Sequence, residues 1–278
     1  MQLLFCVLRG FSLSASKFSH AHTHQLTSFC VWSEARSGQD DIGSAVSAMA
    51  TLEIACFNPE SAIVAGEAGA DRIELCDNQD VGGTTPPPQW LADVKARVNI
   101  PVFVMIRPRE GGFIHTDPEV QQMVADIDRL KSHADGFVFG ILDQDRRIDV
   151  EKTAMLVRKA HPLPCTFHRA FDEAPEPSEA LEAVIATGCH AILTSGGAVT
   201  ANDGTGILQK LVEKARGRID IIPGGGLRLE NLSHIRRMTG ACTFHSSALA
   251  PDATLPDETE IRHMKRMLVE GAGDNGAL

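Results

Sequence analysis

Residues 102–142 read VFVMIRPREGGFIHTDPEVQQMVADIDRLKSHADGFVFGIL. This stretch opens with an apolar run of strand character and closes with a second one, Gly136–Leu142. Between them, the apolar residues of Pro118–Ala134 recur every three or four positions, which indicates a helix. Thr116 precedes that helix as a capping residue, and Pro118 suits its first turn. The stretch therefore predicts a β-α-β unit with two parallel strands.

The same alternation extends in both directions, over residues 51 to 247. Further helical segments lie at Glu151–His161, Pro177–Gly188 and Gly206–Gly217. The predicted strands, spaced evenly along the chain, are Leu52–Phe57, Arg72–Cys76, Val102–Arg107, Gly136–Leu142, Cys165–Ala170, Ala191–Ser195, Asp220–Pro223 and Cys242–Ser247. These runs are almost wholly apolar, as parallel strands covered on both faces should be, and no Rossmann glycine fingerprint follows the first of them. We therefore predict an α/β protein with a single (β/α)8 TIM-type barrel.

The barrel is predicted to span residues 50–270, with a flexible tail at 271–278. Residues 1–49 have a different composition, since an apolar start leads into a serine- and histidine-rich stretch with no acidic residue before Glu34. We expect a disordered extension, or sequence upstream of a natural start at Met49. A mitochondrial targeting segment is the alternative, because such segments are basic, serine-rich and poor in acids. The histidines of this segment could bind divalent metals non-specifically; they are His20, His22 and His24.

The net charge and the cysteines limit which partners and which cellular compartment are expected. The chain has 278 residues and a formal net charge of −10, and residues 1–49 contribute three basic and three acidic groups. The negative excess therefore belongs to the barrel, and it disfavours nucleic acid and membrane surfaces as partners. The seven cysteines show no CxxC spacing, which favours free thiols in a reducing compartment and hence the cytoplasm. No apolar stretch reaches the length of a membrane span.

Polar residues gather where the predicted strands end, which is where barrels of this class carry their sites. Burying several charged groups costs several kcal/mol each unless they are paired, so this concentration predicts a ligand site. The candidate catalytic residues are Glu53, Glu74, His168 and Asp172. The candidate ligand-binding residues are Arg107, Arg109, Arg169, Ser195, Gly225, Gly226, His245 and Ser246. The alternative for Glu53 and Glu74 is a buried pairing with arginine that only fixes the strand register.

Two kinds of chemistry fit these residues. His168 and His245 could act as general acid and base, with a carboxylate of Glu53, Glu74 or Asp172 as the orienting partner. The three arginines, together with the glycine runs after the sixth and seventh strands, would suit a small phosphorylated or carboxylated ligand. The same glycine runs are equally well explained as tight turns. A barrel enzyme acting on a small anionic metabolite is therefore one functional hypothesis.

Seven strings, taken in order, resemble the CutC family of copper-homeostasis proteins over about residues 52 to 248. They are Gly69–Cys76 (GADRIELC), Gly82–Pro86 (GGTTP), Ile106–Arg109 (IRPR), Thr166–Asp172 (TFHRAFD), Leu193–Gly196 (LTSG), Pro223–Gly226 (PGGG) and Phe244–Ala248 (FHSSA). The resemblance implies a (β/α)8 barrel, a cytoplasmic role in copper homeostasis, homo-oligomer formation and binding of copper(I) through cysteine. It implies no particular catalysed reaction. A scaffold that only presents a dimer surface is a third, weaker hypothesis.

The cysteines depart from the family pattern in one place. The family commonly has a cysteine two residues after the glutamate of its first strand, and Ala55 stands there, followed by Cys56. Because strand side chains alternate between faces, Cys56 should point away from the face of Glu53. Cys76 matches the family position. Copper(I) needs two or three thiolate or thioether ligands, so the candidate metal ligands are Cys76 and Cys56, with Met105 as a possible substitute for Cys56.

Overall fold

A computed structural model of the chain describes residues 50–270, and the predictions for residues 1–49 and 271–278 concern residues outside that range. Eight parallel strands form one sheet in the order β7-β6-β5-β4-β3-β2-β1-β8. The strands are β1 (Thr51–Cys56), β2 (Arg72–Leu75), β3 (Val102–Met105), β4 (Gly136–Phe139), β5 (Cys165–Phe167), β6 (Ala191–Thr194), β7 (Asp220–Pro223) and β8 (Thr243–Ser246).

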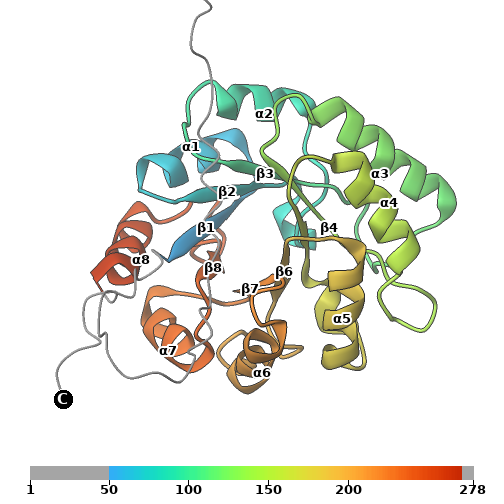
Figure 1. Cartoon of the computed structure of the whole chain (residues 1–278). Helices are drawn as coiled ribbons and strands as arrows, with labels where there is room; N and C mark the ends of the chain where they lie inside the picture. Colours follow the sequence, from blue (N-terminus) through green and yellow to red (C-terminus); the bar gives the residue numbers. More distant parts are fainter. Residues whose placement is uncertain (1–49, 271–278) are drawn as a thin grey trace, which may run out of the picture.

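A helix follows each strand, and the helices form a ring around the strands (Figure 1). The helices are α1 (Pro59–Glu67), α2 (Pro88–Lys95), α3 (Asp117–Leu130), α4 (Val150–Ala160), α5 (Pro177–Thr187), α6 (Thr205–Ala215), α7 (Leu229–Thr239) and α8 (Glu258–Glu270). Two short 3-10 helices, η1 (Gln79–Val81) and η2 (Arg169–Glu173), lie in the loops after β2 and β5. The predicted cap of α3 is confirmed, since the Thr116 side chain accepts a hydrogen bond from the backbone N–H of Glu119.

The two ends of the sheet, β7 and β8, lie next to each other and nearly close the barrel. At this seam the hydroxyl of Thr243 on β8 donates a 2.6 Å hydrogen bond to the Asp220 carboxylate on β7. Closure also makes β8 a hydrogen-bonded neighbour of β1. The predicted single (β/α)8 barrel is confirmed. Within residues 50–270, no helix is long and apolar enough to cross a membrane.

Each strand sorts its side chains into two layers. Residues such as Leu52, Ile54 and Ile73 pack outward against the helices and form the main hydrophobic core. The inward side chains are mixed. Two small clusters of apolar side chains fill parts of the barrel interior. One consists of Cys76, Phe103, Met105 and Val138, and the other of Ala191, Leu193 and Ile222. Beside them lie the buried polar residues Glu53, Glu74, Arg107, Thr166, His168 and His245.

The fifth strand is shorter than its sequence pattern predicts. The pattern extends strand character to Ala170, but β5 ends at Phe167 and η2 begins at Arg169. The cause is local, because the His168 ring accepts a 3.2 Å hydrogen bond from the backbone N–H of Ala170 and so turns the chain. Polar side chains that can bond to a nearby backbone N–H compete with strand pairing in this way.

Close packing inside the barrel makes Gly136→Ala a test of the fold. A Cβ atom at this position would lie 2.6–2.7 Å from three ring atoms of Phe103 on the neighbouring strand β3. We expect the substitution to lower the free energy of unfolding by about 1–3 kcal/mol, measured by urea denaturation. Gly206→Ala is the control, since no atom lies within 4 Å of its added Cβ. Equal stability of Gly136→Ala and the wild type would contradict the described packing.

Candidate functional site

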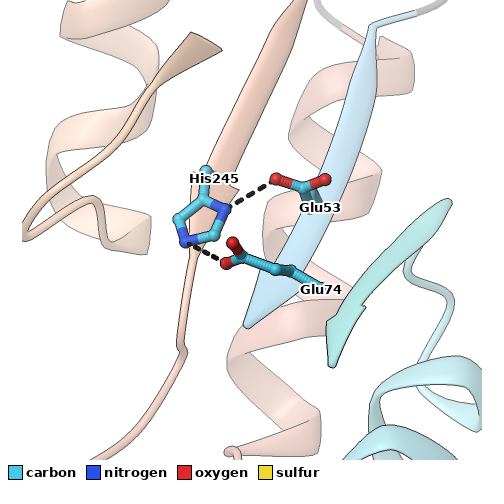
Figure 2. Close-up of side chains that lie close together, drawn as sticks. All are labelled: Glu53, Glu74 and His245. Carbon is cyan, nitrogen blue, oxygen red and sulfur yellow. Dashed lines mark hydrogen bonds and ion pairs between the residues drawn. The ribbon is translucent and has the colours of Figure 1, made fainter. Parts of the chain in front are cut away.

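Glu53, Glu74 and His245 meet inside the barrel, on three neighbouring strands (Figure 2). His245 Nδ1 lies 2.7 Å from Glu53 Oε1, and His245 Nε2 lies 3.5 Å from Glu74 Oε2. All three residues are buried, with exposed fractions of 1%, 3% and 9% respectively. The sheet order explains the meeting, because β1 lies between β8 and β2 and the pairing places Glu53 directly beside His245.

Glu53 has a second partner, Arg72, which stands opposite it on β2. The Arg72 Nε donates a hydrogen bond to Glu53 Oε2, and the guanidinium lies over the Phe103 ring, 4.5 Å from its centroid. Glu53 thus forms a buried cross-strand pair with an arginine, which is the alternative that the sequence offered for the two glutamates. This alternative does not describe Glu74, whose Oε1 is buried and has no hydrogen-bond partner among residues 50–270.

Burial and neighbouring charges separate the two glutamates. Burial raises the pKa of Glu53, but the charge of Arg72 and the hydrogen bond from His245 outweigh it and lower the pKa to about 2. Burial raises the pKa of Glu74 to about 7. Burial lowers the pKa of His245, but the charges of Glu74 and Glu53 outweigh that effect and raise it overall. Glu53 is therefore anionic at neutral pH, whereas Glu74 and His245 compete for a proton.

This arrangement supports two kinds of chemistry. An imidazole held by one carboxylate and facing another can transfer protons. One ligand atom from each of the three residues, all within 4.8 Å of one another, could also hold a metal ion. A set of one nitrogen and two carboxylate oxygens suits divalent transition metals better than copper(I), which prefers sulfur.

The candidate sulfur ligands Cys76 and Met105 lie elsewhere in the interior and belong to one apolar cluster. Both approach Gly83, since a Cβ atom there would lie 3.2 Å from Cys76 Sγ and 3.6 Å from Met105 Cε. Cys56 lies in the layer between strands and helices, and its thiol donates to the backbone carbonyl of Ile54. The structure thus brings Cys76 together with Met105 and places Cys56 on the opposite face of the sheet.

A family model described as the CutC family matches residues 50–250. The chain belongs to the CutC family. It is 47% identical over 198 residues to the human copper homeostasis protein cutC homolog, covering 71% of this chain and 72% of that protein. It is 44% identical over 198 residues to a CutC family protein of Chromobacterium violaceum, covering 71% and 80% of the two chains.

Solved structures agree with this assignment. The crystal structure of the copper homeostasis protein CutC from Streptococcus agalactiae superimposes with a TM-score of 0.68 at 34% identity, covering 72% of this chain and 99% of that one. N-(5'-phosphoribosyl)anthranilate isomerase from Pyrococcus furiosus reaches a TM-score of 0.55 at 14% identity, covering 80% and 99%. The second likeness shows only the shared barrel fold.

In this CutC-family chain, Arg107 holds its surroundings together. Its Nη1 donates hydrogen bonds to the carbonyl oxygens of Val81 and Gly83, and its Nη2 donates to that of Gly111. The guanidinium also lies over the Phe113 ring, 4.9 Å from its centroid. Most of the donors of this predicted ligand-binding residue are therefore engaged with the loops after β2 and β3.

The other two predicted arginines are paired with carboxylates. Arg109 binds Glu119 and donates to carbonyl oxygens of its own loop. The Nε of Arg169 lies 2.8 Å from Asp172, and its Nη2 donates a 3.0 Å hydrogen bond to Ser195 Oγ. These contacts join η2 to the loop after β6, and both arginine side chains keep a similar exposure, 42% for Arg169 and 40% for Arg109.

Two groups of backbone N–H donors that could bind an anion already bind carboxylates of the chain itself. Asp172 accepts 3.0 Å hydrogen bonds from the backbone N–H groups of Ser195 and Gly197 in the glycine turn after β6. Glu260 of α8 accepts a 3.0 Å hydrogen bond from the backbone N–H of Leu229 at the start of α7. Helix N-termini and such turns attract anions, and here these backbone donors already have a carboxylate partner.

The remaining predicted ligand-binding residues shape the loops after β7 and β8. Gly225 and Gly226 have φ values of +101° and +68°, a conformation that favours glycine. The carbonyl of Gly225 accepts a 2.8 Å hydrogen bond from the Ala201 N–H, which ties the loop after β7 to the loop after β6. Ser246 Oγ donates a 2.6 Å hydrogen bond to the carbonyl of Leu227. The glycine run thus forms a tight turn, and ligand binding by Gly225 and Gly226 stays a prediction.

His168 lies apart from the two glutamates. Its Nδ1 accepts from the Ala170 N–H, and its ring packs against Phe113 with centroids 4.8 Å apart. Burial and the nearby charge of Arg107 lower its pKa to about 3, so the ring is neutral. Of the two histidines predicted as acid–base groups, His245 is the one that the structure places beside the glutamates.

Sequence reasoning did not single out Arg72, although it controls the charge of Glu53. A signal was present in the alternation of β2, because Arg72 is two residues before Glu74 and shares its inward face. The partners of the three predicted arginines were not anticipated either. They are backbone carbonyls and acids in loops and helices, which carry no periodic pattern.

Replacing Glu53 tests the central ion pairs. Because the folded-state pKa of Glu53 lies below its ordinary value of 4.5, the ionised carboxylate stabilises the fold above about pH 4.5. This stabilisation is lost as the pH falls toward about 2. We expect Glu53→Gln to lower the free energy of unfolding by about 3 kcal/mol at pH 7, with a smaller difference from wild type at acidic pH.

Urea denaturation between neutral and acidic pH measures this difference. Glu213→Gln, on the exposed face of α6, is the control and should match the wild type at every pH. A Glu53→Gln variant that is as stable as wild type, or whose deficit does not change with pH, would contradict the assigned role of Glu53.

Proposed function

We propose that this CutC-family protein serves copper homeostasis by binding copper(I) at Cys76, inside the barrel. The observation that carries the proposal is the proximity of two sulfur-bearing side chains, Cys76 and Met105, which both approach Gly83. Relatives of the chain, including the human one, bear the name copper homeostasis protein. Thiolate and thioether sulfur are the ligands that copper(I) prefers.

The pairing of β2 with β3 supports the fit. Leu75 stands opposite Val104, so the next positions along the two strands, Cys76 and Met105, are also neighbours. Burial and the negative charge of Glu74 raise the pKa of the Cys76 thiol well above its ordinary value. A metal that binds there must displace the thiol proton, and the positive charge of copper(I) would compensate the thiolate in this buried position.

A barrel enzyme for phosphorylated or carboxylated metabolites has less support. Its binding groups would be Arg107, Arg109 and Arg169, together with the glycine turns. Two of these arginines donate mainly to carbonyl oxygens or to Glu119, and the third is paired with Asp172. An incoming anion would have to compete with these internal partners.

We also propose that the protein works in the cytoplasm and associates with further copies of itself, as the family resemblance implies. Cys56, Cys76, Cys165 and Cys189 are free and buried, which is compatible with a reducing compartment. Light scattering on the purified chain measures its oligomeric state, and fractionation of cells that express it measures its location.

Copper(I) titration against a strong competing chelator, under reducing conditions, tests the assigned ligands. Removing outer partners of a metal site typically weakens binding about 10- to 100-fold, so Cys76→Ala should weaken copper(I) binding by at least about 100-fold. Met105→Leu should weaken it by a smaller factor. Cys56→Ala is the matched control, because this thiol is also buried but faces the helix layer. Unchanged copper(I) affinity in Cys76→Ala would overturn the proposal.

A further inference from the structure

We propose that Glu53, Glu74 and His245 form a second metal site, for a divalent transition-metal ion such as Zn²⁺ or Cu²⁺. The site is distinct from the sulfur pair of Cys76 and Met105. It lies at the junction of β8, β1 and β2, and its occupant is identified by its donor set of one imidazole nitrogen and carboxylate oxygens. The inference stands independently of the copper(I) proposal.

The first support is the position of the ligand atoms. One atom from each of the three side chains lies within 4.8 Å of the others. All three residues belong to strands that are hydrogen-bonded to one another, so their backbones are held in place. As Figure 2 shows, the His245 ring has one nitrogen toward each of the two carboxylates. An ion between Nε2 and the Glu74 carboxylate would therefore leave Nδ1 facing Glu53.

The second support is the orientation of the histidine ring. Glu53 Oε1 lies 2.7 Å from His245 Nδ1, and Glu53 Oε2 accepts from Arg72, so Nδ1 is the ring nitrogen placed to donate its proton to Glu53. In the neutral ring, Nε2 then has its lone pair directed to the side of Glu74. Metal-binding histidines almost always donate their other N–H to a carboxylate or carbonyl in this manner. The Glu53–His245 pair thus prepares Nε2 to bind a metal.

The third support is an unsatisfied oxygen. Glu74 is 3% exposed, and its Oε1 has no hydrogen-bond partner among residues 50–270. Native proteins rarely leave such an atom without a partner, because burial without one costs about 1–3 kcal/mol or more. Oε2 of the same carboxylate lies 3.5 Å from His245 Nε2, so an ion bound there by both oxygens would give Oε1 a partner.

The local charge balance also favours a cation. Arg72 pairs with Glu53 and neutralises it. Among residues 50–270, the ion pairs of Glu74 consist of the contact with His245 alone. An uncompensated buried charge is strongly unfavourable. A divalent ion between Glu74 and His245 would supply the missing positive charge. In this scheme Glu74 and His245 bind the ion directly, and Glu53 holds the ring.

Zn²⁺ binding to the full-length chain, measured by competition with a chromophoric chelator, tests the site. His20, His22 and His24 are first replaced by alanine, so that this histidine-rich segment adds no binding. We expect one Zn²⁺ per chain, and affinity at least about 100-fold lower in Glu74→Gln and in His245→Gln. Glu74→Gln should fold normally, because glutamine resembles the neutral acid that burial favours. His234→Gln, at an exposed histidine of α7, is the matched control and should bind like wild type.

Cu²⁺ electron paramagnetic resonance gives a second readout on the same proteins. We expect hyperfine coupling to one imidazole nitrogen, which disappears in His245→Gln and persists in Cys76→Ala. Unchanged Zn²⁺ affinity in Glu74→Gln, or loss of Zn²⁺ binding in Cys76→Ala, would overturn the second site. Absence of Zn²⁺ binding by the wild-type chain would overturn it as well. Failure of copper(I) binding with Zn²⁺ binding intact would overturn only the proposed function.

Discussion

The interior of this barrel depends on the ion pairs and hydrogen bonds of the buried Glu53 carboxylate. It accepts hydrogen bonds from Arg72 on β2 and from His245 on β8, and so joins β1 to both of its neighbours. A barrel must bring its first and last strands together, and here a charged contact reinforces that closure. A buried carboxylate is stable only when it is paired and hydrogen-bonded, so these three residues depend on one another.

This constraint divides the interior chemically. On the side of β8, β1 and β2, carboxylate oxygens lie beside the nitrogens of His245, whereas Cys76 and Met105 belong to an apolar group with Phe103 and Val138. Glu74 and Cys76 are two residues apart on one strand face, so a single strand contributes to both donor sets. Hard and soft ligands that are this close can select different metal ions without separate domains.

The charged strand ends that suggested an anion site also hold loops of the barrel together. Arg107 and Arg109 hold the loops after β2 and β3, and Asp172 binds the glycine turn after β6. The mouth of the barrel is thus organised by internal ion pairs and hydrogen bonds. Residue types that are typical of ligand binding can equally stabilise loops, and only their partners distinguish the two roles.

The sequence by itself determined the barrel and the face on which each strand residue lies. The period of two in strands and the regular βα repeat are local properties, so they predicted that Cys56 points outward and that Cys76 and Glu74 point inward. Only the tertiary structure decided that His245, and not His168, meets the glutamates, and that most donors of Arg107 and Arg109 are engaged. The physical reason is that these contacts depend on which strands become neighbours when the barrel closes. They also depend on where long side chains find partners in distant loops. Neither dependence produces a periodic pattern in the sequence.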